Sequence, residues 1–107
     1  MIAVLFEAEI HPQHQARYLQ LAADLHPLLA DIAGFIAIER FRSLADEGKI
    51  LSLSWWQDEN AVLAWKQNVL HQAAQQEGRE SIFSFYRIRI AGVLRDYSSE
   101  NRGQPHV

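Results

Sequence analysis

Tryptophan and arginine side chains are the first residues of this chain that could do chemistry. The three tryptophans are Trp55, Trp56 and Trp65. An indole offers a large flat apolar surface and one N–H donor, so it can form the wall of a pocket for an aromatic ligand. Packing in the core is its ordinary role. Because Trp55 and Trp56 are adjacent in a strand-like segment, they point to opposite faces, and the sequence leaves open which of them faces a pocket.

Eight arginines stand against two lysines, and Arg40 and Arg42 share one face of a predicted strand. A fixed guanidinium charge can stabilise an enolate or phenolate as negative charge develops. Ion pairs across strands or between subunits are the ordinary alternative. Tyr18 and Tyr86 are candidates for hydrogen bonds to a substrate hydroxyl, or for core positions with one satisfied oxygen.

The histidines are the candidate proton carriers, because imidazole titrates near neutral pH. His26 precedes Pro27, so it is either an exposed residue at a helix irregularity or a proton carrier at the mouth of a pocket. His71 follows Trp65 by six residues, which is roughly 240° around one continuous helix. The two side chains would then not share a face, and an exposed or flanking position is expected for His71. No metal site is expected, because the nearby pair His11 and His14 lacks the spacing of helical ligands.

Composition excludes several classes of protein. A chain of 107 residues that is 49% hydrophobic is long enough for one domain with one core. A net charge of −3 argues against a nucleic-acid partner. The absence of cysteine excludes a disulfide framework, a thiolate metal site and a cysteine nucleophile. We expect no signal peptide, because the N-terminal apolar run has no basic residue ahead of it and is interrupted early by acids. We also expect no membrane partner, because no apolar run approaches the ~18 to 20 residues of a membrane span, and we expect a cytoplasmic location.

The periodicity of apolar residues predicts the order β-α-β-β-α-β. This order is the α+β, ferredoxin-like arrangement, in which two helices cover one face of a four-stranded antiparallel sheet. Pro27 is expected to kink or break the first helix, because proline removes one helical hydrogen bond. Residues 1–97 form the domain, and the polar segment 98–107 is expected to be mobile. The predicted strands are 2–10, 35–42, 50–56 and 86–95, and the predicted helices run from about Pro12 to Gly34 and from Asp58 to Gly78.

The predicted strands carry apolar side chains on both faces, although two helices can cover only one. A large exposed apolar face is rare on a soluble monomer. A second copy of the same chain, packed sheet against sheet about a two-fold axis, is the economical cover. The sequence therefore predicts a homodimer.

With these segments in view, the chain resembles the antibiotic biosynthesis monooxygenase domain family of small dimeric α+β barrel proteins. The resemblance covers nearly the whole domain, to about Tyr97. The residues that carry it are Tyr18 with 21–29, the run AGFIAIERFRS at 33–43, LSLSWWQDENAVLAW at 51–65, His71, and YRIRIAGVLRDY at 86–97. The resemblance implies a pocket between helices and sheet. It does not distinguish the members of the family.

Members of the family include cofactor-free monooxygenases that oxidise phenols or quinols to quinones, and others that degrade haem or process small signalling molecules. An electron-rich phenolate can itself reduce oxygen, so the resemblance implies a small aromatic ligand and no cofactor. The haem-degrading branch uses an asparagine on the first strand, and a tryptophan and a later histidine on the second helix. This chain matches that branch poorly, since its first strand has no asparagine and His71 follows Trp65 too closely. A non-catalytic ligand-binding or dimerisation module is the alternative, and a haem-binding or haem-degrading protein ranks third. The candidate catalytic residues are Trp65, His71, Tyr86 and Arg40, and the candidate pocket residues are Tyr18, His26 and Trp56.

Overall fold

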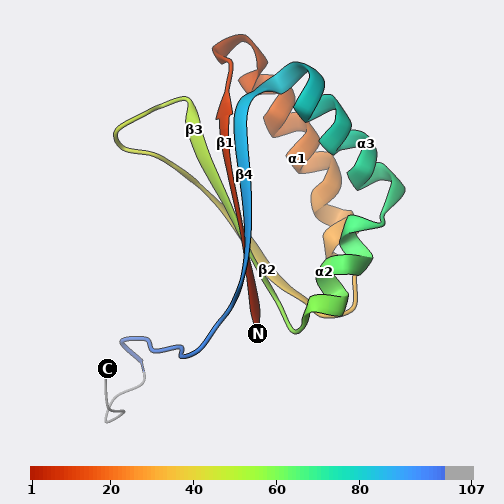
Figure 1. Cartoon of the computed structure of the whole chain (residues 1–107), viewed down its shortest axis with the longest axis vertical. Helices are drawn as coiled ribbons and strands as arrows, with labels where there is room; N and C mark the ends of the chain where they lie inside the picture. Colours follow the sequence, from red (N-terminus) through yellow and green to blue (C-terminus); the bar gives the residue numbers. More distant parts are fainter. Residues whose placement is uncertain (101–107) are drawn as a thin grey trace.

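The computed structural model describes residues 1–100, with the backbone alone described at Val69. All three helices lie on one face of a single four-stranded sheet (Figure 1). The elements are β1 (Ile2–Ile10), α1 (Gln15–Ala30), β2 (Phe35–Arg42), β3 (Lys49–Trp56), α2 (Glu59–Lys66), α3 (Val69–Glu77) and β4 (Phe83–Gly92). A 3-10 turn at Pro12–His14 precedes α1, and a π-helical turn at Gly78–Ile82 precedes β4.

The sheet has the strand order β2-β3-β1-β4, and every neighbouring pair is antiparallel. This topology confirms the predicted ferredoxin-like α+β fold. Strands β1, β2 and β3 begin and end within one residue of the predicted bounds. No helix within residues 1–100 is long and apolar enough to cross a membrane. Most of the predicted mobile segment 98–107 lies outside the described residues.

The predicted second helix is in fact two helices. It begins as expected, because the Asp58 side chain accepts a hydrogen bond from the backbone N–H of Ala61 and so caps α2. It is interrupted after Lys66, and Asn68 caps α3 by accepting a hydrogen bond from the backbone N–H of His71. An asparagine side chain that caps a new helix competes with continuation of the old one. The prediction of one continuous helix was therefore wrong.

Two further boundaries differ from the prediction. Helix α1 continues through Pro27 to Ala30, so the expected break does not occur. Pro27 lies in the last turn of α1, where few helical hydrogen bonds remain to be lost. Strand β4 begins and ends three residues earlier than predicted, since its partner β1 begins at Ile2, which pairs with Gly92. Beyond that point one hydrogen bond, from the Val93 N–H to the Met1 carbonyl, continues the ladder.

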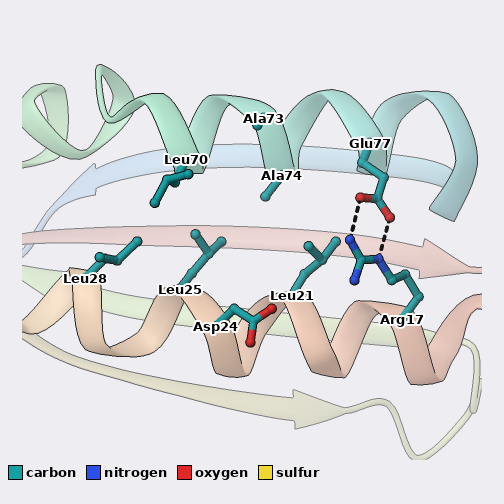
Figure 2. A pocket seen from close by; sticks show the side chains of 9 residues that line it. All are labelled: Arg17, Leu21, Asp24, Leu25, Leu28, Leu70, Ala73, Ala74 and Glu77. Carbon is teal, nitrogen blue, oxygen red and sulfur yellow. Dashed lines mark hydrogen bonds and ion pairs between the residues drawn. The ribbon is translucent and has the colours of Figure 1, made fainter.

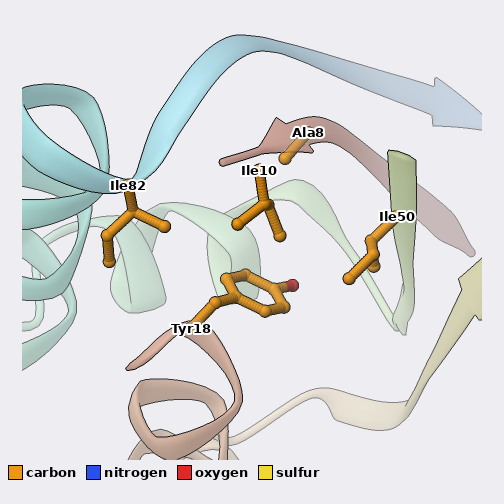
Figure 3. Close-up of a cluster of buried hydrophobic side chains, with 5 residues drawn as sticks. All are labelled: Ala8, Ile10, Tyr18, Ile50 and Ile82. Atoms are coloured by element: carbon orange, nitrogen blue, oxygen red, sulfur yellow. The ribbon is translucent and has the colours of Figure 1, made fainter. Parts of the chain in front are cut away.

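The core lies between the helices and the covered face of the sheet. Alternate residues of β1 and β3 point to this face and divide between two clusters. One cluster joins Tyr18 of α1 to residues of the sheet and of the π-helical turn, namely Ala8, Ile10, Ile50 and Ile82 (Figure 3). The other contains Leu29, Trp56, Ala61, Val62 and Trp65. Trp56 is therefore the member of the tryptophan pair that faces the helices.

The opposite face of the sheet, here called the outer face, carries no helix (Figure 1). Its central side chains are half-buried by their neighbours in the sheet. Phe41 on β2 and Phe85 on β4 are each 44% exposed. The outer face combines these phenylalanines with Leu5, Leu51, Leu53 and Trp55 and with the ion pairs of Glu7 to Lys49 and Arg89.

Substituting Gly34 by alanine is expected to destabilise the fold by about 1–3 kcal/mol. Gly34 joins α1 to β2 with a φ of +91°, and an added Cβ would lie 2.7 Å from the Cβ of Ala61 at the start of α2. Urea unfolding followed by circular dichroism measures the change. Gly92→Ala is the matched control, because its added Cβ has no atom of the described residues within 4 Å apart from its two chain neighbours. Equal midpoints for the two variants would contradict the prediction.

Candidate functional site

A cavity of about 540 Å³ lies between the helices and the covered face of the sheet. All but one of the predicted site residues line it. They come from different elements: Tyr18 from α1, Arg40 from β2, Trp56 from β3, Trp65 from α2, His71 from α3 and Tyr86 from β4. Most of the other lining side chains are aliphatic or aromatic, including Val4, Phe6, Leu21, Leu25, Leu29, Ile38, Val62, Ile82, Phe83, Ile88 and Ile90. A mostly apolar cavity with a few convergent polar groups is typical of small-molecule sites.

Trp65 and His71 form a stacked pair in the cavity wall. Their ring centroids are 4.4 Å apart, and the ring planes are inclined by 29°. The interruption at Asn68 makes this contact possible, because one continuous helix would hold the two rings on different sides. The expectation that they do not share a face was therefore wrong.

The imidazole of His71 is neutral at physiological pH. Burial lowers the pKa of His71 from 6.5 to about 4, and the backbone of Trp65 opposes this shift only in part. Its Nδ1 atom is buried and has no hydrogen-bond partner within residues 1–100. An unpaired buried nitrogen costs free energy. His71 thus lines the cavity with an uncharged imidazole ring.

Arg40 and Tyr18 meet at another point of the cavity. The Arg40 Nε–H donates a hydrogen bond of 3.3 Å to the Tyr18 hydroxyl oxygen. Tyr18 is itself buried, and its ring points from α1 towards the sheet, with the hydroxyl on the side of Ile50 (Figure 3). Ser52 on β3 pairs directly with Arg40 on β2, and it also lines the cavity. A guanidinium group and two hydroxyls are therefore gathered here.

Trp56 and Tyr86 differ in how they can act. Trp56 is 2% exposed, and its indole N–H donates a hydrogen bond of 2.9 Å to the Ser54 hydroxyl. Because this donor already has an acceptor, Trp56 supplies an apolar wall. Tyr86 is 41% exposed and stands beside Ile88 and Ile90 on the open side of the cavity.

His26 is the predicted pocket residue that the structure does not bring to the cavity. It is exposed on α1 and does not line the cavity. Leu25 and Leu29 point inwards, and a residue next to Leu25 is turned by about 100° from it. The interpretation of His26 as an exposed polar residue agrees with this position.

Several polar lining residues were not singled out from the sequence. Ser52 and Ser54 share a strand face with Trp56, and this alternation was visible in the sequence. Lys66 ends α2 and Arg79 lies in the π-helical turn, where no periodicity indicates a direction. Gln75 of α3 was hidden by the assumption of one continuous helix. Within residues 1–100, no three His, Asp or Glu side chains are grouped to hold a metal ion.

A smaller cavity of about 240 Å³ lies in the seam between α1 and α3 (Figure 2). Arg17 and Glu77 close one end with hydrogen bonds of 2.6 and 2.8 Å. This pairing raises the pKa of Arg17 and lowers the pKa of Glu77. Leucines from α1 face Leu70 and Ala74 across the seam (Figure 2). Leu21, Leu25 and Ala74 line both cavities, so they form the wall between the seam and the larger cavity.

The family model described as antibiotic biosynthesis monooxygenase matches residues 1–77 of the chain. A protein of Pyricularia oryzae named jasmonate monooxygenase ABM is 41% identical over 99 residues, which is 92% of this chain and 46% of that protein. The chain thus spans about half the length of this relative. The uncharacterized protein YqjZ of Bacillus subtilis is 30% identical over 93 residues, covering 87% of this chain and 79% of YqjZ.

Solved structures show the same fold at low sequence identity. A protein of Deinococcus radiodurans assigned to the antibiotic biosynthesis monooxygenases superposes with a TM-score of 0.82 at 13% identity, over 92% of this chain and 97% of that one. Rv0793 of Mycobacterium tuberculosis gives a TM-score of 0.80 at 11% identity, over 91% and 98%. At these identities the likeness concerns the fold alone.

Proposed function

The chain belongs to the antibiotic biosynthesis monooxygenase family, and we propose that it is a cofactor-independent monooxygenase of a small phenol or quinol. The observation that carries the proposal is the Trp65–His71 stack in the wall of a mostly apolar cavity. The name of the Pyricularia oryzae relative supports monooxygenase chemistry. The mostly apolar lining of the cavity supports an aromatic substrate.

The proposed reaction needs no external reductant. A phenol and O₂ give a quinone and water: the O–O bond and one ring C–H bond break, and a new C–O bond forms. One oxygen atom becomes the second quinone carbonyl, and the other leaves as water with the two hydrogens that the phenol loses. The ring supplies all four electrons, the first of them directly to O₂. A water-poor cavity suits this step because it excludes side reactions.

Each candidate residue has a role in this reaction. Trp65 and Trp56 hold the flat ring, and Tyr86 forms a hydrogen bond to a substrate oxygen at the open side. The neutral imidazole of His71 accepts the phenol proton. A group with a pKa of about 4 is a weak base, but the phenol becomes strongly acidic as its electron leaves for O₂. Arg40 supplies fixed positive charge inside the cavity for an anionic substrate.

The proposal predicts enzyme-dependent uptake of ¹⁸O₂ by chelator-treated protein with 1-naphthol, and one labelled oxygen per naphthoquinone formed. Trp65→Phe is expected to lower the rate by about 10- to 100-fold, because a smaller ring lets the substrate move away from its reacting position. Trp55→Phe on the outer face is the matched control and should keep the rate. An oxygen electrode and mass spectrometry provide the measurement, corrected for autoxidation.

Uptake no faster than autoxidation, with naphthol or naphthoquinol, would reject the oxygenase. Ligand binding without uptake would favour the second candidate, a non-catalytic binding module. One observation favours that alternative: no aspartate or glutamate is found among the described lining residues, so His71 has no acidic partner in the cavity wall. Uptake of O₂ with release of hydrogen peroxide and no label in the product would indicate a quinol oxidase.

We further propose that the protein is a homodimer joined through the outer face. The exposed rings of Phe41 and Phe85 support this assembly, because a second copy would remove them from water. Sedimentation equilibrium gives the mass of the particle in solution, and a monomer at micromolar concentration would contradict the proposal. The cytoplasmic location and the domain end at Tyr97 stay predictions.

A further inference from the structure

We propose that the Arg40 end of the cavity binds a carboxylate, so that the substrate is a phenol or quinol that also carries a carboxylate group. This proposal deepens the proposed function and rests on it for the identity of the ring. The cavity's charges and the placement of its polar groups support the carboxylate by themselves.

The cavity has an unbalanced charge. Its lining contains no aspartate or glutamate among the described residues, but it contains Arg40, Lys66 and Arg79. His71 adds no charge near neutral pH. Arg40 makes no ion pair within residues 1–100, although it is only partly exposed. An anion stabilises a guanidinium group in a mostly apolar cavity, and no described residue in the cavity wall supplies one.

Three side chains with hydrogen-bond donors gather at the Arg40 end. The Arg40 Nε–H donates to the Tyr18 oxygen, and the two Nη groups have no partner within residues 1–100, so they can bind a ligand. The hydroxyl hydrogen of Tyr18 is donated to no group in the described part of the chain. Ser52 pairs across the strands with Arg40, so their Cβ atoms are about 5 Å apart. A planar carboxylate fits this set, because it accepts several hydrogen bonds at once and pairs well with guanidinium.

The carboxylate end of the cavity, at Arg40, is separate from the end at Trp56 and Trp65 that would hold the aromatic ring. Along β3, Ser52 precedes Trp56 by four residues, which is about 13 Å of strand. Trp56 and Trp65 belong to one buried cluster, and Tyr18 belongs to the other. The two ends of the cavity therefore suit a fused two-ring molecule with a hydroxyl at one end and a carboxylate at the other.

Isothermal titration with 6-hydroxy-2-naphthoate, its methyl ester and 2-naphthol tests the proposal. We expect the acid to bind about 10- to 100-fold more tightly than the ester, which is the range for a hydrogen-bonded charge. Arg40→Met should remove this difference and leave the affinity of the ester unchanged. Tyr18→Phe should reduce the difference in part, because it removes one donor and keeps the ring.

Arg87→Met is the control for charge, because Arg87 lies on the outer face of β4 and does not line the cavity. It should keep the preference for the acid. Three results would overturn the proposal. They are equal affinity for the acid and the ester, the same loss of preference for the acid in Arg87→Met as in Arg40→Met, and no binding of any of the three probes. Tight, Arg40-dependent binding of the acid, with no ¹⁸O₂ uptake above autoxidation for naphthol or naphthoquinol, would refute the oxygenase and leave the carboxylate site intact. Uptake of ¹⁸O₂ with 1-naphthol, together with equal affinity for the acid and the ester, would refute the carboxylate site and support the oxygenase.

Discussion

Substituting His71 by phenylalanine is expected to lower the rate of quinone formation by about 10²- to 10⁴-fold, the range for loss of a positioned proton acceptor. A phenyl ring can keep the stack on Trp65, whose centroid lies 4.4 Å from that of His71. It also removes the buried Nδ1 atom that lacks a hydrogen-bond partner within residues 1–100, and it removes the interaction of the imidazole with the Trp65 backbone, so these two effects on the fold oppose each other. The loss should therefore appear in kcat, measured by oxygen uptake, with little change in unfolding.

The pH profile of the wild-type protein distinguishes this role from a structural one. The proton-accepting form of His71 is the neutral form, which is present above its pKa and lost as pH falls. With a pKa of about 4, the rate should be nearly constant from pH 7 to pH 5 and fall only below that. A histidine with the ordinary pKa of about 6.5 would lose activity in that very range.

His11→Phe makes the same exchange at an exposed histidine before α1 and should keep the wild-type rate and pH profile. A His71→Phe variant that retains more than half of the rate would contradict the role of His71. A wild-type profile that falls with a midpoint near pH 6.5 would contradict the buried, neutral state of the imidazole.

The fold followed from the sequence because its signals are local. The alternation in 2–10 and 50–56 and the cap at Asp58 each depend on a few neighbouring residues, and all three are confirmed. The interruption at Asn68 is different in kind. Asn68 can lie within a helix or cap a new one, and the balance depends on what the flanking turns contact in the folded chain. The conformation at this one residue therefore decides whether the Trp65 and His71 rings lie together in the cavity wall.

Part of the site could also be predicted from local sequence signals. Residue types and strand positions indicated Arg40 and Tyr86. Trp56 was a candidate by residue type, but the sequence left open which of Trp55 and Trp56 faces the pocket. The Arg40–Tyr18 contact joins residues 22 positions apart, on β2 and α1. The lack of an acidic side chain among the described residues of the cavity wall is a property of the whole wall, which includes Lys66 and Arg79, and no motif marked these two residues. Such a balance of charges can be read only from the folded structure, because it depends on which side chains are brought together in the wall.

The adjacent tryptophans should respond differently to truncation. Trp56→Ala is expected to destabilise the protein by about 3–5 kcal/mol, because Trp56 is 2% exposed and its removal leaves a large cavity in the core. It also removes the partner of the Ser54 hydroxyl. Urea unfolding at two protein concentrations measures the change, which should be the same at both.

Trp55→Ala is the matched control, since the side chain of Trp55 is only half-buried on the outer face. Its cost should be less than half that of Trp56→Ala at low protein concentration. If the outer face joins two copies, the wild-type midpoint rises with protein concentration, because association stabilises the folded chain, and Trp55→Ala weakens that rise. Equal costs for the two variants would contradict the assignment of their faces. A wild-type midpoint that is independent of concentration would count against an interface coupled to folding, so this one pair of residues tests both faces of the sheet.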